Sequence, residues 1–113
     1  MSPVDTTFAA LADPTRRGVI ELLRRRPRRA GELATELETS APAMSRHLRV
    51  LRTSGLVEED HAGTDARIRT YRLKRERFTE LRRWLEQVES FWAAELSAFK
   101  AHAERSRGKG LLR

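Results

Sequence analysis

A short stretch in the middle of the chain combines arginines with small and hydroxyl side chains and excludes acids. Between positions 39 and 57 the sequence holds Arg46, Arg49 and Arg52 but no Asp or Glu, although the whole chain has 16 acidic residues. A guanidinium group donates hydrogen bonds in a planar fork that fits phosphate oxygens and the major-groove edge of guanine. The arginines and the missing acids therefore predict a surface that meets a nucleic acid.

The same stretch carries the start and stop signals of one helix. Ser40 can cap the first turn, where Pro42 gives up no intrahelical hydrogen bond, and Gly55 supplies a left-handed residue after the last turn. Apolar residues at helical spacing predict one buried stripe, formed by Met44, Leu48 and Leu51. We interpret the segment as a DNA recognition helix, and His47 also fits a second interpretation, a structural buttress between helices. The candidate contacts are Ser40, Ala41, Pro42, Ser45, Arg46, His47 and Arg49.

The composition favours a small DNA-binding domain over an enzyme. The 113 residues suffice for a single core, and the net charge of +7 favours a polyanionic partner. The chain has no cysteine, which excludes disulfides, thiolate metal sites and thiol redox sensing.

The sequence also lacks a phosphate-cradling glycine loop, paired carboxylates in an apolar setting, and a His beside a plausible nucleophile, so we expect no catalysis. No apolar run approaches the ~18 residues of a membrane span and no signal-peptide pattern occurs, which favours a cytoplasmic protein.

Three shorter helices are predicted ahead of the recognition helix. Residues 5–12 form an amphipathic helix, Asp13 and Pro14 start a second that ends near residue 25, and a third covers residues 31–37. The third helix, a tight turn and the recognition helix together make a helix-turn-helix. Residues 24–29 are too charged and too broken by proline to extend the second helix, and this loop fits either a solubilising or a DNA-binding role.

Arg16 and Arg17 lie in the first turn of the second predicted helix. Free amides and guanidinium groups can together bind a phosphate there, and cations at a helix start are unfavourable without an anion. We therefore include both arginines among the candidate DNA contacts.

After the recognition helix the apolar pattern changes from helical spacing to alternation. Residues 56–61 and 67–73 flank a turn-rich segment and predict a β-hairpin, the wing that follows a recognition helix. Arg67 and Arg69 lie on one face of the second strand and are candidate contacts to an adjacent minor groove or its phosphates. The open alternative is that these arginines pair across the strands with Glu58 or Asp60.

Residues 75–105 predict one long helix without Gly or Pro. Its apolar stripe exceeds what a core of this size can cover, so a second copy is the simplest partner, with the first helix packed beside it. The predicted dimer interface is Phe8, Leu11, Leu81, Leu85, Val88, Trp92, Leu96 and Phe99. Trp84 and Phe91 widen the stripe, and a ligand pocket among these aromatic residues is the minor alternative. Two glycines among basic residues predict that residues 106–113 form a basic flexible tail. Residues 1–105 are then the DNA-binding domain with its terminal dimerisation helices.

These motifs follow the order found in a known family. The chain resembles the winged-helix repressors of the ArsR type at residues 8–17, 31–34, 45–51, 54–57 and 71–73. The resemblance implies a mainly α fold with a small β-hairpin, a winged helix-turn-helix with a long C-terminal dimerisation helix. It implies a homodimer on an inverted-repeat operator, with Ser40 to Arg49 in the major groove and the wing on the flanking backbone. The aromatic last helix is similar to a metal-independent branch, whose members often repress their own operons.

The metal sites of the family are missing at the matching positions. Metal-sensing members carry a cysteine pair just before the Glu-Leu that corresponds to Glu32-Leu33, where this chain reads Arg-Ala-Gly at residues 29–31. Other members bind zinc across the paired last helices through two histidines per chain, and this chain has only His102 there. His102 and Glu104 are better interpreted as part of a solvated face. We therefore expect no metal cofactor.

Two functions remain open from the sequence. The leading one is a sequence-specific dimeric repressor that binds double-stranded DNA. The alternative is a winged-helix module for protein contact or for non-specific DNA coating, which predicts similar affinity for random and promoter DNA. What releases the protein from DNA is open between a small molecule, a partner protein and no inducer.

Overall fold

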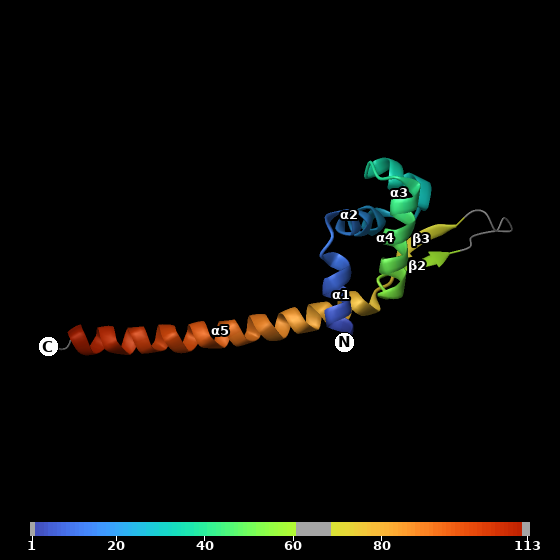
Figure 1. Cartoon of the computed structure of the whole chain (residues 1–113). Helices are drawn as coiled ribbons and strands as arrows, with labels where there is room; N and C mark the ends of the chain where they lie inside the picture. Colours follow the sequence, from blue (N-terminus) through green and yellow to red (C-terminus); the bar gives the residue numbers. More distant parts are fainter. Residues whose placement is uncertain (1, 61–68, 112–113) are drawn as a thin grey trace. The chain divides into compact units, whose positions relative to one another are not determined.

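The computed structural model describes residues 2–60 and 69–111, so the predicted hairpin tip and Arg67 lie outside the described residues. In chain order the elements are α1 (Pro3–Leu11), α2 (Pro14–Arg25), β1 (Arg28–Arg29), α3 (Ala30–Glu36), α4 (Ala41–Thr53), β2 (Val57–Asp60), β3 (Thr70–Leu73) and α5 (Glu76–Leu111) (Figure 1). The chain divides into two compact units, Met1–Leu81 and Arg82–Arg113. The order of helices and strands is that of a winged helix-turn-helix, which confirms the predicted fold class.

Side-chain caps set where the helices of the first unit begin. At the start of α4 the Ser40 hydroxyl accepts a hydrogen bond from the Ala43 amide at 3.2 Å, and Pro42 lies in the first turn. At the start of α2 the Asp13 carboxylate accepts one from the Arg16 amide at 3.0 Å. Each cap satisfies an amide that has no partner within its own helix. Both starts agree with the sequence prediction.

α1 begins earlier than predicted and buries small residues rather than its large apolar ones. A capping box at Ser2 starts the helix ahead of the predicted residue 5. Thr7 and Ala10 are buried, and these small side chains let α1 approach α2, which it contacts. Phe8 is half-exposed, whereas Leu11 packs partly against the core of its own chain. Leu11 thus contributes to the fold of one chain, although the sequence prediction placed it in the dimer interface.

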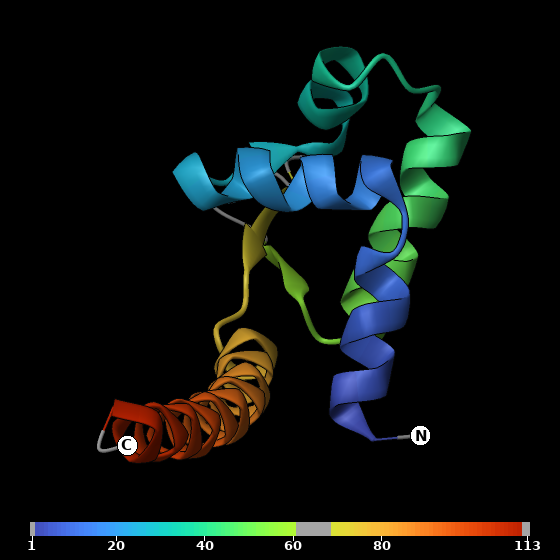
Figure 2. The same ribbon diagram turned by 90° about the vertical axis from the view of Figure 1, so that its left-hand side faces the viewer.

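The core of the first unit lies where α2, α3 and α4 meet the strands. Its buried apolar side chains are Ala10, Val19, Leu23, Leu33, Ala34, Met44, Leu48, Leu51, Leu56 and Val57. α3 contacts α4, and α2 contacts both α4 and β3; Figure 2 shows α2 lying across this unit. Helical spacing predicts the α4 stripe of Met44, Leu48 and Leu51 as buried, and the structure confirms it. Removing these side chains from water is the main favourable term in folding the unit.

Three antiparallel strands in the order β1-β3-β2 form the base of the wing. β2 and β3 pair along all their residues, which confirms the predicted hairpin. β1 adds two residues to the other edge of β3, with Arg28 opposite Tyr71 and Arg29 opposite Thr70. This strand corrects the prediction that residues 24–29 form only a loop. Two residues are too few to show alternation, and the neighbouring Pro27 suggests a break rather than a strand.

The second unit consists of α5 from Arg82 onward, and most of its apolar side chains face solvent. The exposed large apolar residues of this helix are Trp84, Leu85, Phe91, Trp92, Leu96 and Phe99. The rings of Phe91 and Trp92 meet edge to face with centroids 5.9 Å apart. Within the described residues, no helix is long and apolar enough to cross a membrane.

α5 also extends past the predicted end of the helix. Its backbone stays helical to Leu111, so the predicted tail of residues 106–113 is helical over most of its length. The glycines at 108 and 110 suggested the tail, but a helical glycine keeps its backbone donor and costs only about 1 kcal/mol relative to alanine. The predicted division into residues 1–105 and a tail therefore does not follow a helix boundary.

Candidate nucleic-acid interface

α4 presents the predicted contacts on the side away from its buried stripe. The exposed residues are Ser40, Ala41, Pro42, Ser45, Arg46 and Arg49. No hydrogen bond or ion pair to another described residue engages the guanidinium groups of Arg46 and Arg49. Ser40 differs from the others because its hydroxyl already caps the helix. The two arginines are therefore available to an external acceptor, which is what a recognition helix requires.

The side chain of His47 on α4 contacts the start of α2. Its Nδ1 atom is 3.4 Å from Nη1 of Arg16 and 3.9 Å from Oδ1 of Asp13, and the side chain is mostly buried. These contacts connect the recognition helix α4 to the start of α2. The geometry supports the buttress interpretation of His47 over direct DNA contact.

Arg16 and Arg17 bind the end of α1. The Nε atom of Arg16 donates to the Ala10 carbonyl oxygen at 2.6 Å, and Nη1 of Arg17 donates to the Leu11 carbonyl oxygen at 2.8 Å. Carbonyls in the last turn of a helix lack intrahelical donors, and cations there are favourable. Both arginines therefore have a structural role that the sequence did not reveal. Phosphate binding by these two residues stays a prediction.

Loss of the α2 cap should be measurable in stability. Asp13→Ala should destabilise the fold by about 1 kcal/mol, because the amide of Arg16 loses its acceptor. That hydrogen bond lowers the pKa of Asp13 below its ordinary value of 3.8. The contribution of the charged form is therefore full above this ordinary value and is lost as the pH falls through the lower folded pKa.

Asp13→Asn is the matched control, since it keeps a capping oxygen and removes the charge. Urea unfolding across a series of pH values should show the stability advantage of the wild type over Asp13→Asn shrinking as the solution becomes acidic. An advantage that does not change with pH would contradict the role of the charge.

The wing arginines and acids pair in a way that differs from the predicted alternative. The carboxylate of Glu59 accepts hydrogen bonds from Nη1 of Arg52 at 2.9 Å and from the Tyr71 hydroxyl at 2.8 Å. Nη1 of Arg69 lies 3.7 Å from the same carboxylate. Arg69 therefore pairs with Glu59, and not with Glu58, which binds Arg72 at 2.6 Å. Burial, followed by the hydrogen bond to Glu59, raises the pKa of Tyr71 above its ordinary value. Arg52 was one of the three arginines of the acid-free stretch, but neither it nor Tyr71 was among the candidate contacts predicted from the sequence.

A hollow of about 160 Å³ joins the recognition helix to the wing. We call it the recognition hollow, and its lining is Ser45, Leu48, Arg49, Arg52, Glu59, Arg69 and Tyr71. It brings together three of the predicted contacts, two from α4 and one from the wing. The signal that could have found Arg52 is its position three residues after Arg49 on the same helix, because residues at this spacing share a face.

The arginine-rich segment before α3 has structural partners. Arg28 is buried in β1, and its Nε atom has no hydrogen-bond partner among the described residues. Arg24 pairs with Glu21 at 2.9 Å and Arg26 with Glu32 at 3.2 Å, all on the surface. These contacts favour a structural and solubilising role over the DNA-binding interpretation. No group of three or more metal-ligating side chains occurs in the described part of the chain.

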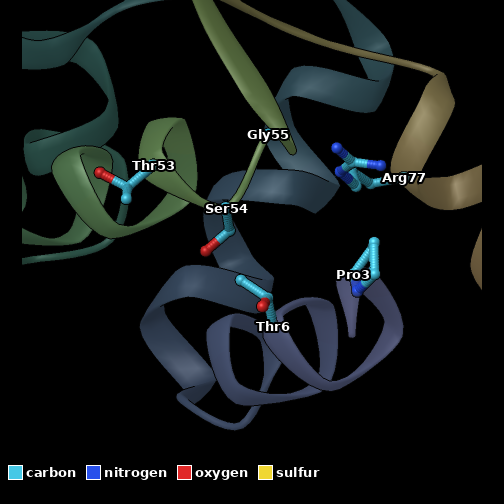
Figure 3. Close-up of a pocket in the computed structure, with 6 residues that line it drawn as sticks. All are labelled: Pro3, Thr6, Thr53, Ser54, Gly55 and Arg77. Atoms are coloured by element: carbon cyan, nitrogen blue, oxygen red, sulfur yellow. The ribbon is translucent and has the colours of Figure 1, made fainter. Parts of the chain in front are cut away.

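A second hollow of about 220 Å³ lies at the other end of α4 (Figure 3). Residues of α1, the end of α4 and the first turn of α5 line it, and its Arg77 pairs with Glu80 at 2.6 Å. Gly55 is at its edge with a φ of 79°, the left-handed conformation that the sequence predicted. A Cβ atom at this position would lie 3.2 Å from Cγ and Nε of Arg77. A side chain at position 55 would therefore crowd Arg77, which lines this hollow.

Gly55→Ala should destabilise the fold by about 1 to 2 kcal/mol, because a side chain disfavours the left-handed conformation. Gly31→Ala is the matched control, since nothing lies within 4 Å of its Cβ position and it is in a helix. The control should instead be stabilising by up to about 1 kcal/mol. Thermal unfolding of both variants checks the opposite signs, and an equally stable Gly55→Ala protein would contradict the assignment.

Relatives of this chain are named as transcriptional regulators. A family model described as "Bacterial regulatory protein, arsR family" matches residues 13–59. The HTH-type transcriptional regulator Rv2034 of Mycobacterium tuberculosis is 41% identical over 95 residues, covering 84% of this chain and 83% of that protein. The transcriptional repressor SdpR of Bacillus subtilis is 32% identical over 60 residues, covering 53% of this chain and 67% of that protein. The solved ArsR-like transcriptional regulator from Rhodococcus sp. RHA1 matches with a TM-score of 0.70 at 34% identity, covering 87% of this chain and 90% of that one.

Proposed function

This chain belongs to the ArsR family of bacterial regulatory proteins, and from that premise we propose that it is a homodimeric repressor of an inverted-repeat operator, working without metal. It is a transcriptional regulator with a DNA-binding winged helix-turn-helix, and not an enzyme. The observation that carries the proposal is the exposed, acid-free face of α4, whose Arg46 and Arg49 have no partner among the described residues. The proposal includes a cytoplasmic location.

The exposed side of α4 and the adjoining wing form what we call the recognition face. Some of its side chains are suited to contact base edges, and others to bind phosphates and so position the protein on DNA. We assign base reading to the exposed side chains of α4, because the N-terminal part of a recognition helix enters the major groove. Arg69 on the wing is suited to phosphate, since it extends beside the recognition hollow and is mostly exposed. Contacts to phosphate fix the register of the protein, whereas contacts to base edges discriminate sequence.

The dimer part of the proposal rests on the exposed apolar face of α5. Trp92 is 59% exposed and Phe99 is 72% exposed, although tryptophan and phenylalanine bury large apolar areas when a partner is present. A contiguous apolar face of this kind marks an interaction surface. A second copy of the same helix is the simplest cover, and its two-fold symmetry matches an inverted repeat. Phe8 and Leu11 stay predictions for this interface.

Repression is supported by the relative SdpR, which is named a transcriptional repressor and is 32% identical over 60 residues. A bound dimer would occlude a promoter that contains its operator. Release from DNA would come from a small molecule or a partner protein, or the protein would act without an inducer. The second candidate function, non-specific coating of DNA or protein contact, is favoured by the net charge of +7 alone.

An electrophoretic mobility shift separates the two functions. The probe is DNA from immediately upstream of the protein's own gene, with random competitor at two salt concentrations and excess chelator in one arm. The proposal predicts a retarded band that survives competitor and chelator. Equal loss to random competitor would favour non-specific coating, and loss in the chelator arm would contradict the metal-independent mechanism.

A further inference from the structure

Among the described residues that line the recognition hollow, Glu59 is the one acid. A carboxylate on a surface that meets phosphates repels them and lowers affinity for DNA. The neighbouring acids Glu58 and Asp60 lie beside Arg72 instead, at 2.6 Å and 3.8 Å. The charge of Glu59 is thus directed at the candidate interface, while those of its neighbours are directed at another arginine.

The Glu59 carboxylate is held from both sides of the hollow. Arg52 on α4 reaches one oxygen, and the Tyr71 hydroxyl on β3 fixes the other. Only 16% of the Glu59 side chain is exposed, so these charge-assisted contacts are partly shielded from water and salt. The result is one shielded carboxylate that gathers an arginine from the helix and Arg69 from the wing.

We infer that Glu59 is a specificity-determining positioning residue, which holds Arg52 and Arg69 in one orientation and makes a phosphate in any other position compete with it for them. The inference rests on the proposed binding of DNA by this face. A guanidinium group has five donors, so an arginine that spends one or two on Glu59 can still offer the others to a phosphate in the matching position.

This arrangement lowers the affinity for DNA on which the phosphates do not match the positions of the held arginines. On operator DNA the base contacts of α4 fix the duplex, and phosphates meet the free edges of the two held arginines. On random DNA an arginine reaches a phosphate only by leaving a shielded carboxylate without its partner, which offsets part of the gain. Glu59 therefore lowers affinity for random sequences more than affinity for the operator.

Glu59→Gln tests the inference, because it removes the charge and keeps the shape and an acceptor oxygen. Glu58→Gln is the matched control. It removes the same charge at the neighbouring position, from a carboxylate that is bound to Arg72 instead of Arg52 and Arg69. Fluorescence anisotropy gives the affinity of each protein for a random duplex and for an operator that the wild type selects from a random library. Both duplexes are titrated across a series of salt concentrations.

We expect Glu59→Gln to bind random DNA roughly tenfold more tightly than Glu58→Gln, because two arginines become available to any phosphate. The slope of log affinity against log salt should steepen by about 0.9 for each phosphate newly neutralised. The ratio of operator to random affinity should fall by a similar factor of roughly ten. Adding Arg52→Gln to Glu59→Gln should remove about half of the added slope.

Equal salt slopes for Glu59→Gln and Glu58→Gln on random DNA would overturn the inference, since Glu59 would then act only as one more negative charge. An unchanged ratio of operator to random affinity in Glu59→Gln would overturn it as well. Failure of the proposed function has a different signature, in which the wild type selects no operator. The slopes on random DNA would then still decide whether Glu59 restrains the arginines.

Discussion

The double variant Arg46→Ala, Arg49→Ala should bind the operator on the order of 100-fold more weakly than the wild type, because each bidentate contact to guanine contributes roughly 1 to 3 kcal/mol. Both side chains project from the exposed face of α4, and neither has a partner among the described residues. Their removal therefore leaves the core and the dimer intact. Anisotropy titration with operator DNA measures the effect, and sedimentation checks the oligomeric state.

Arg82→Ala, Arg83→Ala is the control for this double variant. It removes the same charge from two exposed arginines of α5, which belong neither to the helix-turn-helix nor to the wing. Loss of general electrostatic attraction should therefore be similar in both proteins, and only the α4 variant should lose discrimination. Unchanged operator affinity in Arg46→Ala and in Arg49→Ala would contradict the recognition-helix assignment.

The single variants distinguish a base contact from a phosphate contact. Loss of an arginine that reads a base should relax the preference at one operator position. Loss of an arginine that binds phosphate should weaken binding to all sequences alike and reduce the salt slope by about 1. Measuring each variant against operators changed at one position therefore assigns Arg46 and Arg49 separately.

Trp92→Glu should convert the dimer to monomers at micromolar concentrations. The apolar face of α5 is mostly exposed in one chain, and a carboxylate buried in the proposed interface without a partner would cost several kcal/mol. Analytical ultracentrifugation measures the shift in dimer dissociation. Operator affinity should fall with it, because a monomer engages one half-site and loses the gain from linking two.

Ser90→Glu is the control for the interface. It adds the same charge to an exposed position two residues away, on the opposite side of the helix from Trp92. This variant should remain dimeric and should keep its operator affinity within a small electrostatic correction. A Trp92→Glu protein that is still dimeric would contradict the proposed interface.

Local signals in the sequence determined most of the fold. Asp13 and Ser40 cap α2 and α4 as predicted, Gly55 ends α4 in the left-handed conformation, and the α4 stripe is buried. These features depend on residues within one or two turns of each other, so a single sequence can reveal them. The same local spacing placed the arginines of α4 on one exposed face.

Only the tertiary structure decided which polar groups meet. Arg16 reaches the carbonyls at the end of α1, Arg28 is buried in a strand of two residues, and Glu59 gathers Arg52 and Arg69. Each of these contacts joins residues on different elements, and a long arginine has many acceptors within reach of its flexible stem. Which acceptor it uses is fixed by how the helices and strands pack around the core. The sequence by itself therefore determined the elements and the exposed basic face, and the packing determined which arginines are left for DNA.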